Sequence, residues 1–208
     1  MGLYSEHILP RLNEFALSRE PILAARRRVA RGLQGVVLEI GLGSGLNLPY
    51  YPADVTRVLA VEPSPVARQL ARNRIEQLEQ SAIPFAWSGL DGQRLGLEDA
   101  SVDTALTTFT LCTIPDLALA LSELRRVIRP NGALHFLEHG RSPDRSVARW
   151  QDRLNPLQRR IAAGCNLNRD LPQRLREAGF CIDSLDAYYI PGPRFAGYFF
   201  EGRARNCC

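Results

Sequence analysis

Three glycines stand at alternate positions directly after a short apolar stretch, in the order Gly41-x-Gly43-x-Gly45. Glycine lets a backbone turn tightly and approach a ligand closely, so such a turn between a strand and a helix is typical of a nucleotide-like site. A dinucleotide site would need glycine or alanine at position 46, where Leu46 stands. Pro49 and Pro52 shorten the helix that would bind a pyrophosphate. The spacing therefore predicts a zwitterionic ligand without a phosphate.

Acidic residues follow where they could bind the rest of such a ligand. Glu62 ends a second apolar strand about 20 residues later, where a carboxylate can accept hydrogen bonds from both ribose hydroxyls. Asp91 follows a third strand and would reach the exocyclic amine of adenine, with the amide of Gly92 at a ring nitrogen, although Asp-Gly is also a common turn pair. Glu39 could orient an amino group, and the end of a fourth strand offers weakly polar groups that suit a diffuse positive charge. The residues expected to bind the ligand are Glu39, Gly41, Gly43, Gly45, Glu62, Pro63, Asp91, Gly92, Thr107, Thr110 and Leu111.

Candidates for chemistry on a second substrate lie near the ends of later strands. His139 ends a fifth strand, at the edge where ligands bind in open α/β sheets, and an imidazole can accept a proton near neutral pH. A loop histidine with only local hydrogen bonds fits the same pattern. His135 lies mid-strand and is expected to be packed. Cys112 follows the fourth strand, but nothing in the sequence would lower its pKa for a covalent role, so a packed residue is favoured there.

The elements that must position these residues alternate between strands and helices. Alternation of this kind predicts a parallel sheet with helices on both faces. Two consecutive strands around Pro191-Gly192-Pro193 predict an antiparallel hairpin at the end. We therefore expect an α/β, Rossmann-like fold with a seven-stranded, mostly parallel sheet, a terminal antiparallel hairpin and helices on both faces. The expected strands are 36–40, 58–61, 85–87, 102–109, 133–137, 181–189 and 195–201, and the expected helices between them include 65–80, 116–128 and 171–178.

The 208 residues are expected to form a single domain with two helical additions. Residues 1–34 are predicted to be an amphipathic lid, broken near Pro21. Residues 141–165 are an arginine-rich insertion that we expect to cap the acceptor pocket. Within it, one helical face carries Trp150, Leu154, Leu157 and Ile161; alternatively that face lies in a membrane interface, with the arginines on anionic headgroups. Cys165 and Asn166 are expected to open the next helix. The residues expected to line the substrate pocket are Tyr4, His7, Trp150, Cys165 and Asn166.

The amino-acid composition limits the partners and the cellular location that we expect for this protein. All 26 basic residues are arginine, and a net charge of +4 is only a weak indication of an anionic partner. No apolar run is long enough to span a membrane, and the first residues lack the apolar core of a signal peptide. We therefore expect a cytoplasmic protein with five reduced cysteines. No cysteine or histidine spacing predicts a metal site.

One motif points toward nucleic acid and is rejected. Asn47-Leu48-Pro49-Tyr50 is similar to the motif of enzymes that methylate amino groups of nucleic acids, but that motif belongs after the fourth strand. Thr110-Leu111-Cys112-Thr113 stands there instead. The insertion also lacks a stacking array of aromatic residues. Nucleic acid is therefore not expected as a partner.

Several stretches together resemble a known family. They are VLEIGLGSGLNLPYYP, VLAVEPSP, LEDASVDTALTTFTLCTIPD, LRRVIRPNGALHFLEHG and GCNLNRD, covering roughly residues 36–170. They resemble class I methyltransferases of the methyltransferase-11 type, which use S-adenosylmethionine (SAM). The stretches LEHG and GCNLNRD are more specific than the others. They are most similar to the thiol S-methyltransferases of animal membranes and their soluble bacterial relatives. The animal proteins carry a hydrophobic anchor at the N-terminus, where this chain has an amphipathic segment.

The resemblance implies that SAM is the cofactor and that its methyl group passes to a small-molecule acceptor, a thiol in the narrower comparison. Such a transfer is one displacement, which needs mainly proximity and alignment. His139 would then be the base. Two alternatives remain: a lipid or quinone methyltransferase at a membrane surface, and a SAM-binding sensor without turnover.

Overall fold

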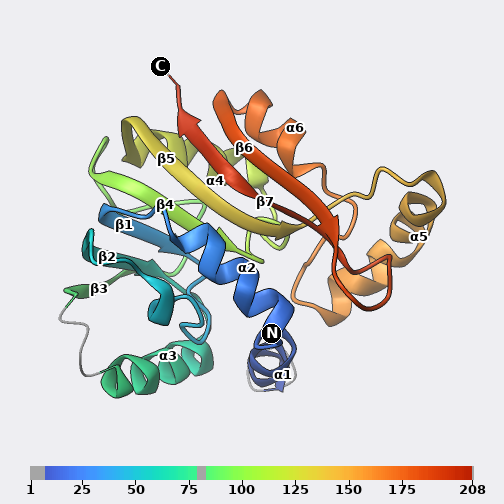
Figure 1. The fold of residues 1–208 in the computed structure, drawn as a ribbon, viewed down its shortest axis with the longest axis horizontal. Helices are drawn as coiled ribbons and strands as arrows, with labels where there is room; N and C mark the ends of the chain where they lie inside the picture. The colour runs from blue at the N-terminus through green and yellow to red at the C-terminus, as the bar shows by residue number, and fades with distance from the viewer. Residues whose placement is uncertain (1–7, 79–82, 208) are drawn as a thin grey trace.

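The computed structural model describes residues 8–78 and 83–207, and its centre is a seven-stranded sheet (Figure 1). The strand order is β3-β2-β1-β4-β5-β7-β6, in which β1 to β5 pair in parallel and β7 runs antiparallel to both β5 and β6. The expected fold class is confirmed. The strands are β1 (Gly35–Ile40), β2 (Val55–Val61), β3 (Phe85–Gly89), β4 (Val102–Thr108), β5 (Ile128–His139), β6 (Phe180–Tyr189) and β7 (Tyr198–Asn206).

Helices cover both faces of the sheet, because its central strands are apolar on both sides. In Figure 1, α2 crosses the near face and α4 lies behind the sheet. On β4, Leu106 packs in the cluster around α2, whereas Ala105 packs in the cluster around α4. The helices are α1 (Leu9–Leu17), α2 (Glu20–Ala30), a 3-10 turn η2 (Leu48–Tyr50), α3 (Pro65–Gln77), α4 (Leu117–Val127), α5 (Arg145–Ile161) and α6 (Leu171–Glu177).

Side-chain caps set the starts of three helices. Ser64 accepts a hydrogen bond from the amide of Ala67 at α3, and Asp116 caps α4 in the same way. Asp170 accepts from the amide of Gln173, so α6 begins at Leu171. The expectation that Cys165 and Asn166 open this helix was wrong, because both lie in the loop before the capping aspartate.

Helix α5 is continuous through Pro156 and turns a different face toward the protein than we expected. The side chains of Trp150 and Leu157 are 55% and 56% exposed, whereas Val147 and Gln151 are buried. Gln151 accepts from the amide of Ser142 and donates to the carbonyl oxygens of Gly140 and Phe195. These three hydrogen bonds offset the cost of burying a polar amide.

Two of the five cysteines form a disulfide, although all five were expected to be reduced. Cys181 and Cys207 are joined by a disulfide, which connects the start of β6 to the residue after β7. Their Cα atoms lie 5.9 Å apart because the antiparallel pairing brings the two strand ends together. Cys112 and Cys165 are free and buried. Within the described part of the chain, no helix is both long and apolar enough to cross a bilayer.

His135 is packed, as the sequence predicted, and it makes stability depend on pH. Its ring is 4% exposed, with Nδ1 2.9 Å from the carbonyl oxygen of Val29 on α2. Burial lowers the pKa of His135 to about 4. The unfolded chain therefore binds more protons between pH 6.5 and 4, so stability is lost as pH falls through that window.

We expect this histidine to remove about 2 kcal/mol of unfolding free energy between pH 7 and pH 5. Urea unfolding of the wild type and of His135→Gln at both pH values measures the effect. The variant should have a lower free energy of unfolding than the wild type at pH 7, and this free energy should decrease less between pH 7 and pH 5. Parallel losses in the two proteins would show that folding does not lower the pKa of His135.

Candidate functional site

The glycine turn, residues 41–45, lies directly after β1. Gly41, Gly43 and Gly45 all have positive φ angles, of 74°, 58° and 78°. A side chain on Gly41 would also overlap Thr110, which follows β4. The turn therefore requires glycine at position 41 both for its backbone conformation and for its contact with the next loop.

Glu62 holds the glycine turn against the end of β2. Its carboxylate is 7% exposed and accepts hydrogen bonds from the amides of Gly43 and Ser64, each at 2.8 Å. Burial raises the pKa of Glu62, and these two bonds act in the opposite direction. The structure thus brings together Glu62 and the glycines, as the sequence predicted, while the adjoining Pro63 is exposed.

A buried polar network beside the turn includes a residue that the sequence did not single out. Arg26 of α2 donates to Asn47 Oδ1 at 2.8 Å and to Thr108 Oγ1 at 2.7 Å. Asn47 in turn donates to Glu39 at 2.6 Å, and Tyr51 also donates to Glu39. Arg26 Nε has no hydrogen-bond partner among the described residues.

Burial dominates the charges in this network. It raises the pKa of Glu39 to about 7, although hydrogen bonds from Tyr51 and Asn47 lower it. It lowers the pKa of Arg26 to about 10, against the attraction of Glu39. Arg26 lies on the same helical face as Ile22 and Val29, which are buried. That register was the signal in the sequence that could have distinguished it from its exposed neighbour Arg27.

Glu138 organises the loop after β4 from the next strand. Its fully buried carboxylate accepts from the amides of Thr110, Leu111 and Cys112, at 3.0, 3.0 and 3.2 Å. Burial raises the pKa of Glu138, and the three amides lower it. The function of this residue was missed, although the LEHG stretch was noted.

The other residues predicted to bind the cofactor make fewer contacts with the glycine turn and the polar network. Asp91 is exposed and accepts from the amide of Gln93, whereas Gly92 is buried against Ile40. Thr107 is fully buried within the sheet, and its hydroxyl has no partner among the described residues. Its neighbour Thr108 faces the polar network instead.

Helix α1 is attached over the glycine turn. Glu14 forms an ion pair with Arg74 of α3 at 2.6 Å and accepts from the hydroxyl of Ser44 in the turn. Arg74 also donates to the carbonyl oxygen of Ser44. The first helix of the predicted lid therefore contacts the turn through an acid that the sequence analysis did not identify.

A cavity of about 570 Å³, the central cavity, lies beyond the ends of β4 and β5. Parts of α1, the end of α5 and the β6–β7 loop surround it, and Phe109 and Phe199 provide an apolar wall. Its polar lining includes Cys112, His139 and Cys165, which we call the thiol–imidazole cluster. The His139 ring packs edge-on against Phe109 and Phe199, with centroids 5.3 and 5.0 Å away.

The two thiols of the cluster differ in acidity. The hydrogen bond with Cys112 is the main reason that the pKa of Cys165 falls to about 5, and contact with His139 acts in the same direction. The pKa of Cys112 is raised by that hydrogen bond and by burial. Cys165 is therefore the more acidic thiol of the two.

The remaining pocket residues predicted from the sequence lie in different places. Cys165 and His139 line the central cavity, but Trp150 does not, and the end of α5 contributes Gln158 and Ala162 instead. Asn166 donates to the carbonyl oxygens of Cys112 and Gly164, and so holds the backbone of Cys112, which lines the cavity. Tyr4 and His7 lie outside the described residues.

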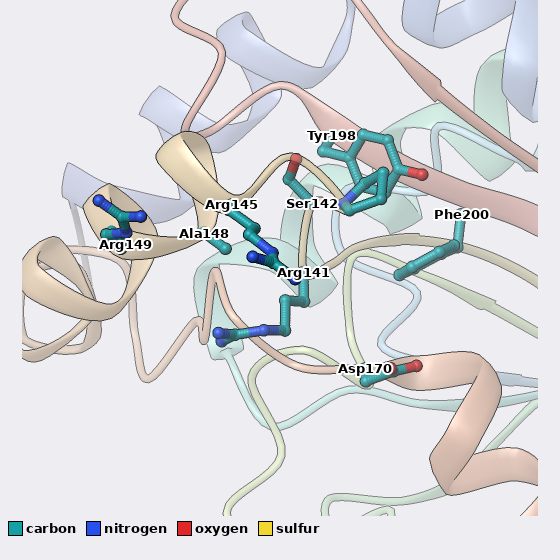
Figure 2. Close-up of a pocket in the computed structure, with 9 residues that line it drawn as sticks. Arg141, Ser142, Arg145, Ala148, Arg149, Asp170, Tyr198 and Phe200 are labelled. Atoms are coloured by element: carbon teal, nitrogen blue, oxygen red, sulfur yellow. The ribbon is translucent and has the colours of Figure 1, made fainter.

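Figure 2 shows a second hollow, of about 550 Å³, beside the start of α5. Arg145 and Arg149 approach it from the helix, and Tyr198 and Phe200 lie on the opposite side. Arg141 is paired with Asp152. Neither the glycine turn nor the thiol–imidazole cluster lines this hollow, so it is separate from the site described above.

Comparisons with known proteins agree with this architecture. A protein family described as a methyltransferase domain matches residues 38–136 of this chain. Human thiol S-methyltransferase TMT1B is 33% identical over 181 residues, which cover 83% of this chain and 72% of that protein. Human thiol S-methyltransferase TMT1A is 32% identical over 164 residues, covering 76% and 64%. A solved SAM-dependent methyltransferase from Aquifex aeolicus has a TM-score of 0.66 at 19% identity, covering 94% of this chain and 97% of that one.

The chain therefore belongs to the class I SAM-dependent methyltransferases, and its methyl donor is SAM. Its glycine turn, its acid at the end of β2 and its antiparallel β7 are the features of the fold and site that fit this family.

Proposed function

We propose that this enzyme transfers the methyl group of SAM to the sulfur of a small, apolar thiol bound in the central cavity. The observation that carries the proposal is the cavity itself. It lies at the ends of β4 and β5, with aromatic walls and a polar end formed by the thiol–imidazole cluster, and the loop after β4 that contributes to its lining also lies against Gly41 of the glycine turn through Thr110. Relatives named as thiol S-methyltransferases support the same acceptor.

Residues of this chain fit the parts of SAM. We assign Glu62 to the ribose hydroxyls, and Asp91 with the amide of Gly92 to the adenine. The network of Glu39 and Arg26 suits the amino and carboxylate groups of the methionyl end, because Arg26 Nε is buried and has no partner among the described residues. We assign α1 as a lid, since Glu14 attaches it to the glycine turn.

The protein then needs to supply mainly alignment. SAM brings an activated methyl group, and the chain holds the acceptor sulfur in line with it and excludes water. The buried carboxylate of Glu138 fixes the loop that separates the glycine turn from the cavity. The apolar wall favours acceptors without charge, because desolvating a carboxylate there is costly.

Small alkyl and aryl thiols should be methylated with at least about 100-fold higher kcat/KM than glutathione, whose two carboxylates would need desolvation. Formation of S-adenosylhomocysteine and of the methyl thioether, followed by mass spectrometry, measures this. Phenols of the same shape as the aryl thiols are the matched control and should react far more slowly. Preference for glutathione, or for the phenols, would contradict the proposed acceptor.

A second candidate is methylation at a membrane surface, and it rests on the exposed apolar side chains around the cavity. Phe15 of α1 is 77% exposed, and Trp150 and Leu157 of α5 are more than half exposed. Arg149 and Arg153 lie beside them on α5. An apolar surface bordered by arginines is typical of a helix lying at an anionic membrane interface.

Sedimentation with vesicles that contain anionic lipid tests this candidate. If α5 docks on lipid, Trp150→Ala should reduce the bound fraction several-fold at low salt, because apolar contact area is lost. Leu119→Ala is the matched control, since Leu119 is an exposed leucine on a different helix, α4. Equal sedimentation of all three proteins would exclude docking through α5.

A further inference from the structure

The thiol–imidazole cluster assembles residues that lie far apart in the sequence. Cys165 Sγ is 3.6 Å from Cys112 Sγ, across 53 residues, and 3.5 Å from His139 Nδ1, across 26 residues. All three ligand atoms lie within 4.8 Å of one another. No sequence spacing indicated a metal site, because the fold and not a local motif brings these atoms together.

The two separations at Cys165 match edges of a zinc tetrahedron. Bond lengths of about 2.3 Å for sulfur and about 2.0–2.1 Å for nitrogen, at tetrahedral angles, place two sulfurs about 3.8 Å apart and sulfur and nitrogen about 3.6 Å apart. The observed distances for these two edges are 3.6 and 3.5 Å, and the third pair of ligand atoms, on Cys112 and His139, lies within 4.8 Å. A single ion could therefore bind the two thiols and the imidazole after side-chain shifts that close this third edge.

The backbone that carries the two thiols is tied together from both sides. Asn166 donates to the carbonyl oxygen of Cys112 through its amide at 2.8 Å and through its side chain at 3.0 Å. Glu138 accepts from the amide of Cys112. Supporting hydrogen bonds of this kind hold metal ligands in position.

We infer that Cys112, Cys165 and His139 form a Zn²⁺ site whose fourth position opens into the central cavity. Two cysteines and one histidine with an open position are a known ligand set of catalytic zinc. Two thiolates neutralise the charge of the ion, which suits a buried site. The three side chains line the cavity, so an occupant of the cavity can reach the fourth position.

The use of that position rests on the proposed function. An acceptor thiol would become the fourth ligand and release its proton to solvent, because zinc stabilises the thiolate. A lone pair of its sulfur then forms the new bond to the methyl carbon. The sulfonium–methyl bond breaks, and its electron pair stays on the sulfur of S-adenosylhomocysteine. His139 is then a ligand, in place of the general base expected from the sequence.

Titration with Co²⁺ tests the site without any turnover. The full chain, reduced with a reagent that contains no thiol, should bind one Co²⁺ with sulfur-to-cobalt charge-transfer bands of two thiolates, and Zn²⁺ should displace it. Cys112→Ser and Cys165→Ser should each remove one thiolate from the spectrum. Each should also weaken Zn²⁺ binding by more than about 100-fold, the upper end of what losing a supporting hydrogen bond costs at metal sites.

A double variant, Cys181→Ser with Cys207→Ser, is the matched control. It removes the other described cysteines and should leave the bands unchanged. Absence of charge-transfer bands in the reduced protein, or bands of undiminished intensity in Cys112→Ser and in Cys165→Ser, would overturn the site.

Methylation assays with and without metal distinguish a failure of this inference from a failure of the proposed function. Protein stripped with a chelator should lose thiol methylation while still binding SAM, and Zn²⁺ should restore it. Full thiol methylation by the metal-free protein would overturn the role of the metal and leave the proposed acceptor intact. Two-thiolate Co²⁺ binding without methylation of any thiol would overturn the acceptor and leave the site intact.

Discussion

Replacing Glu62 with alanine should weaken SAM binding by about 1.5–3 kcal/mol, which corresponds to roughly 10- to 150-fold in Kd. The carboxylate accepts hydrogen bonds from the amides of Gly43 and Ser64 and lies where the ribose hydroxyls are expected. Its loss removes both an anchor of the glycine turn and a charged hydrogen-bond acceptor. Isothermal calorimetry with SAM and S-adenosylhomocysteine measures the effect, and NAD should not bind to either protein.

Glu76→Ala is the matched control, because Glu76 is an exposed acid on the neighbouring helix α3. It should bind SAM like the wild type. Glu62→Gln keeps one oxygen acceptor and should fall between the two. Unchanged affinity in Glu62→Ala, with the fold intact by circular dichroism, would remove Glu62 from the cofactor site.

Features set by local sequence were predictable from the chain alone. The glycine turn, the acid at the end of β2 and the order of strands and helices each follow from neighbouring residues, because alternation and turn chemistry act over short distances. Boundaries were less exact: β5 extends over Ile128–His139, whereas 133–137 was expected. The fold was therefore predictable at the level of its elements, its mostly parallel sheet and its terminal antiparallel hairpin, whereas the strand order was not predicted.

The buried face of α5 was not predictable from periodicity. The spacing of Trp150, Leu154, Leu157 and Ile161 defines one apolar stripe, but it does not say which side of the helix the protein covers. Three hydrogen bonds allow the polar Gln151 to be buried instead. Satisfaction of a buried amide depends on partners from distant loops, which a single-sequence pattern does not contain.

The thiol–imidazole cluster and the Arg26 network were missed for the same reason. Their members come from α2, from the last residues of β1, β4 and β5, from the loops after β1 and β4, and from the segment after α5, so no short motif joins them. In the sequence, Arg26 is one of three consecutive arginines. Its register with Ile22 and Val29 could have separated it from Arg27, but its partners Asn47 and Thr108 come from distant parts of the chain.

Arg26→Met should be the most destabilising single change considered, at about 3–5 kcal/mol of unfolding free energy. Methionine keeps the approximate length and apolar contacts of the side chain, but it leaves Glu39 without its cation and Asn47 Oδ1 without its donor, and Thr108 keeps only the hydrogen bond from Asn47. Urea unfolding measures the loss. Removing the second charge as well, in Arg26→Met with Glu39→Gln, should recover a substantial part of it, since an unpaired buried carboxylate costs more than a neutral pair.

The pH dependence of this deficit distinguishes an unpaired charge from lost packing. The pKa of Glu39 is already raised to about 7 in the wild type, and loss of Arg26 raises it further. Below that pKa and above the unfolded value of 4.5, the folded variant binds more protons than the unfolded chain, so its stability falls as pH rises. The deficit of Arg26→Met should therefore be larger at pH 8 than at pH 6, whereas the stability of the double variant, which has no carboxyl at position 39, should not fall with pH through this group. The contribution of His135 is common to all three proteins and cancels. A deficit equal at both pH values would mean that Arg26 acts through packing and hydrogen bonds alone, and that Glu39 does not depend on it for charge.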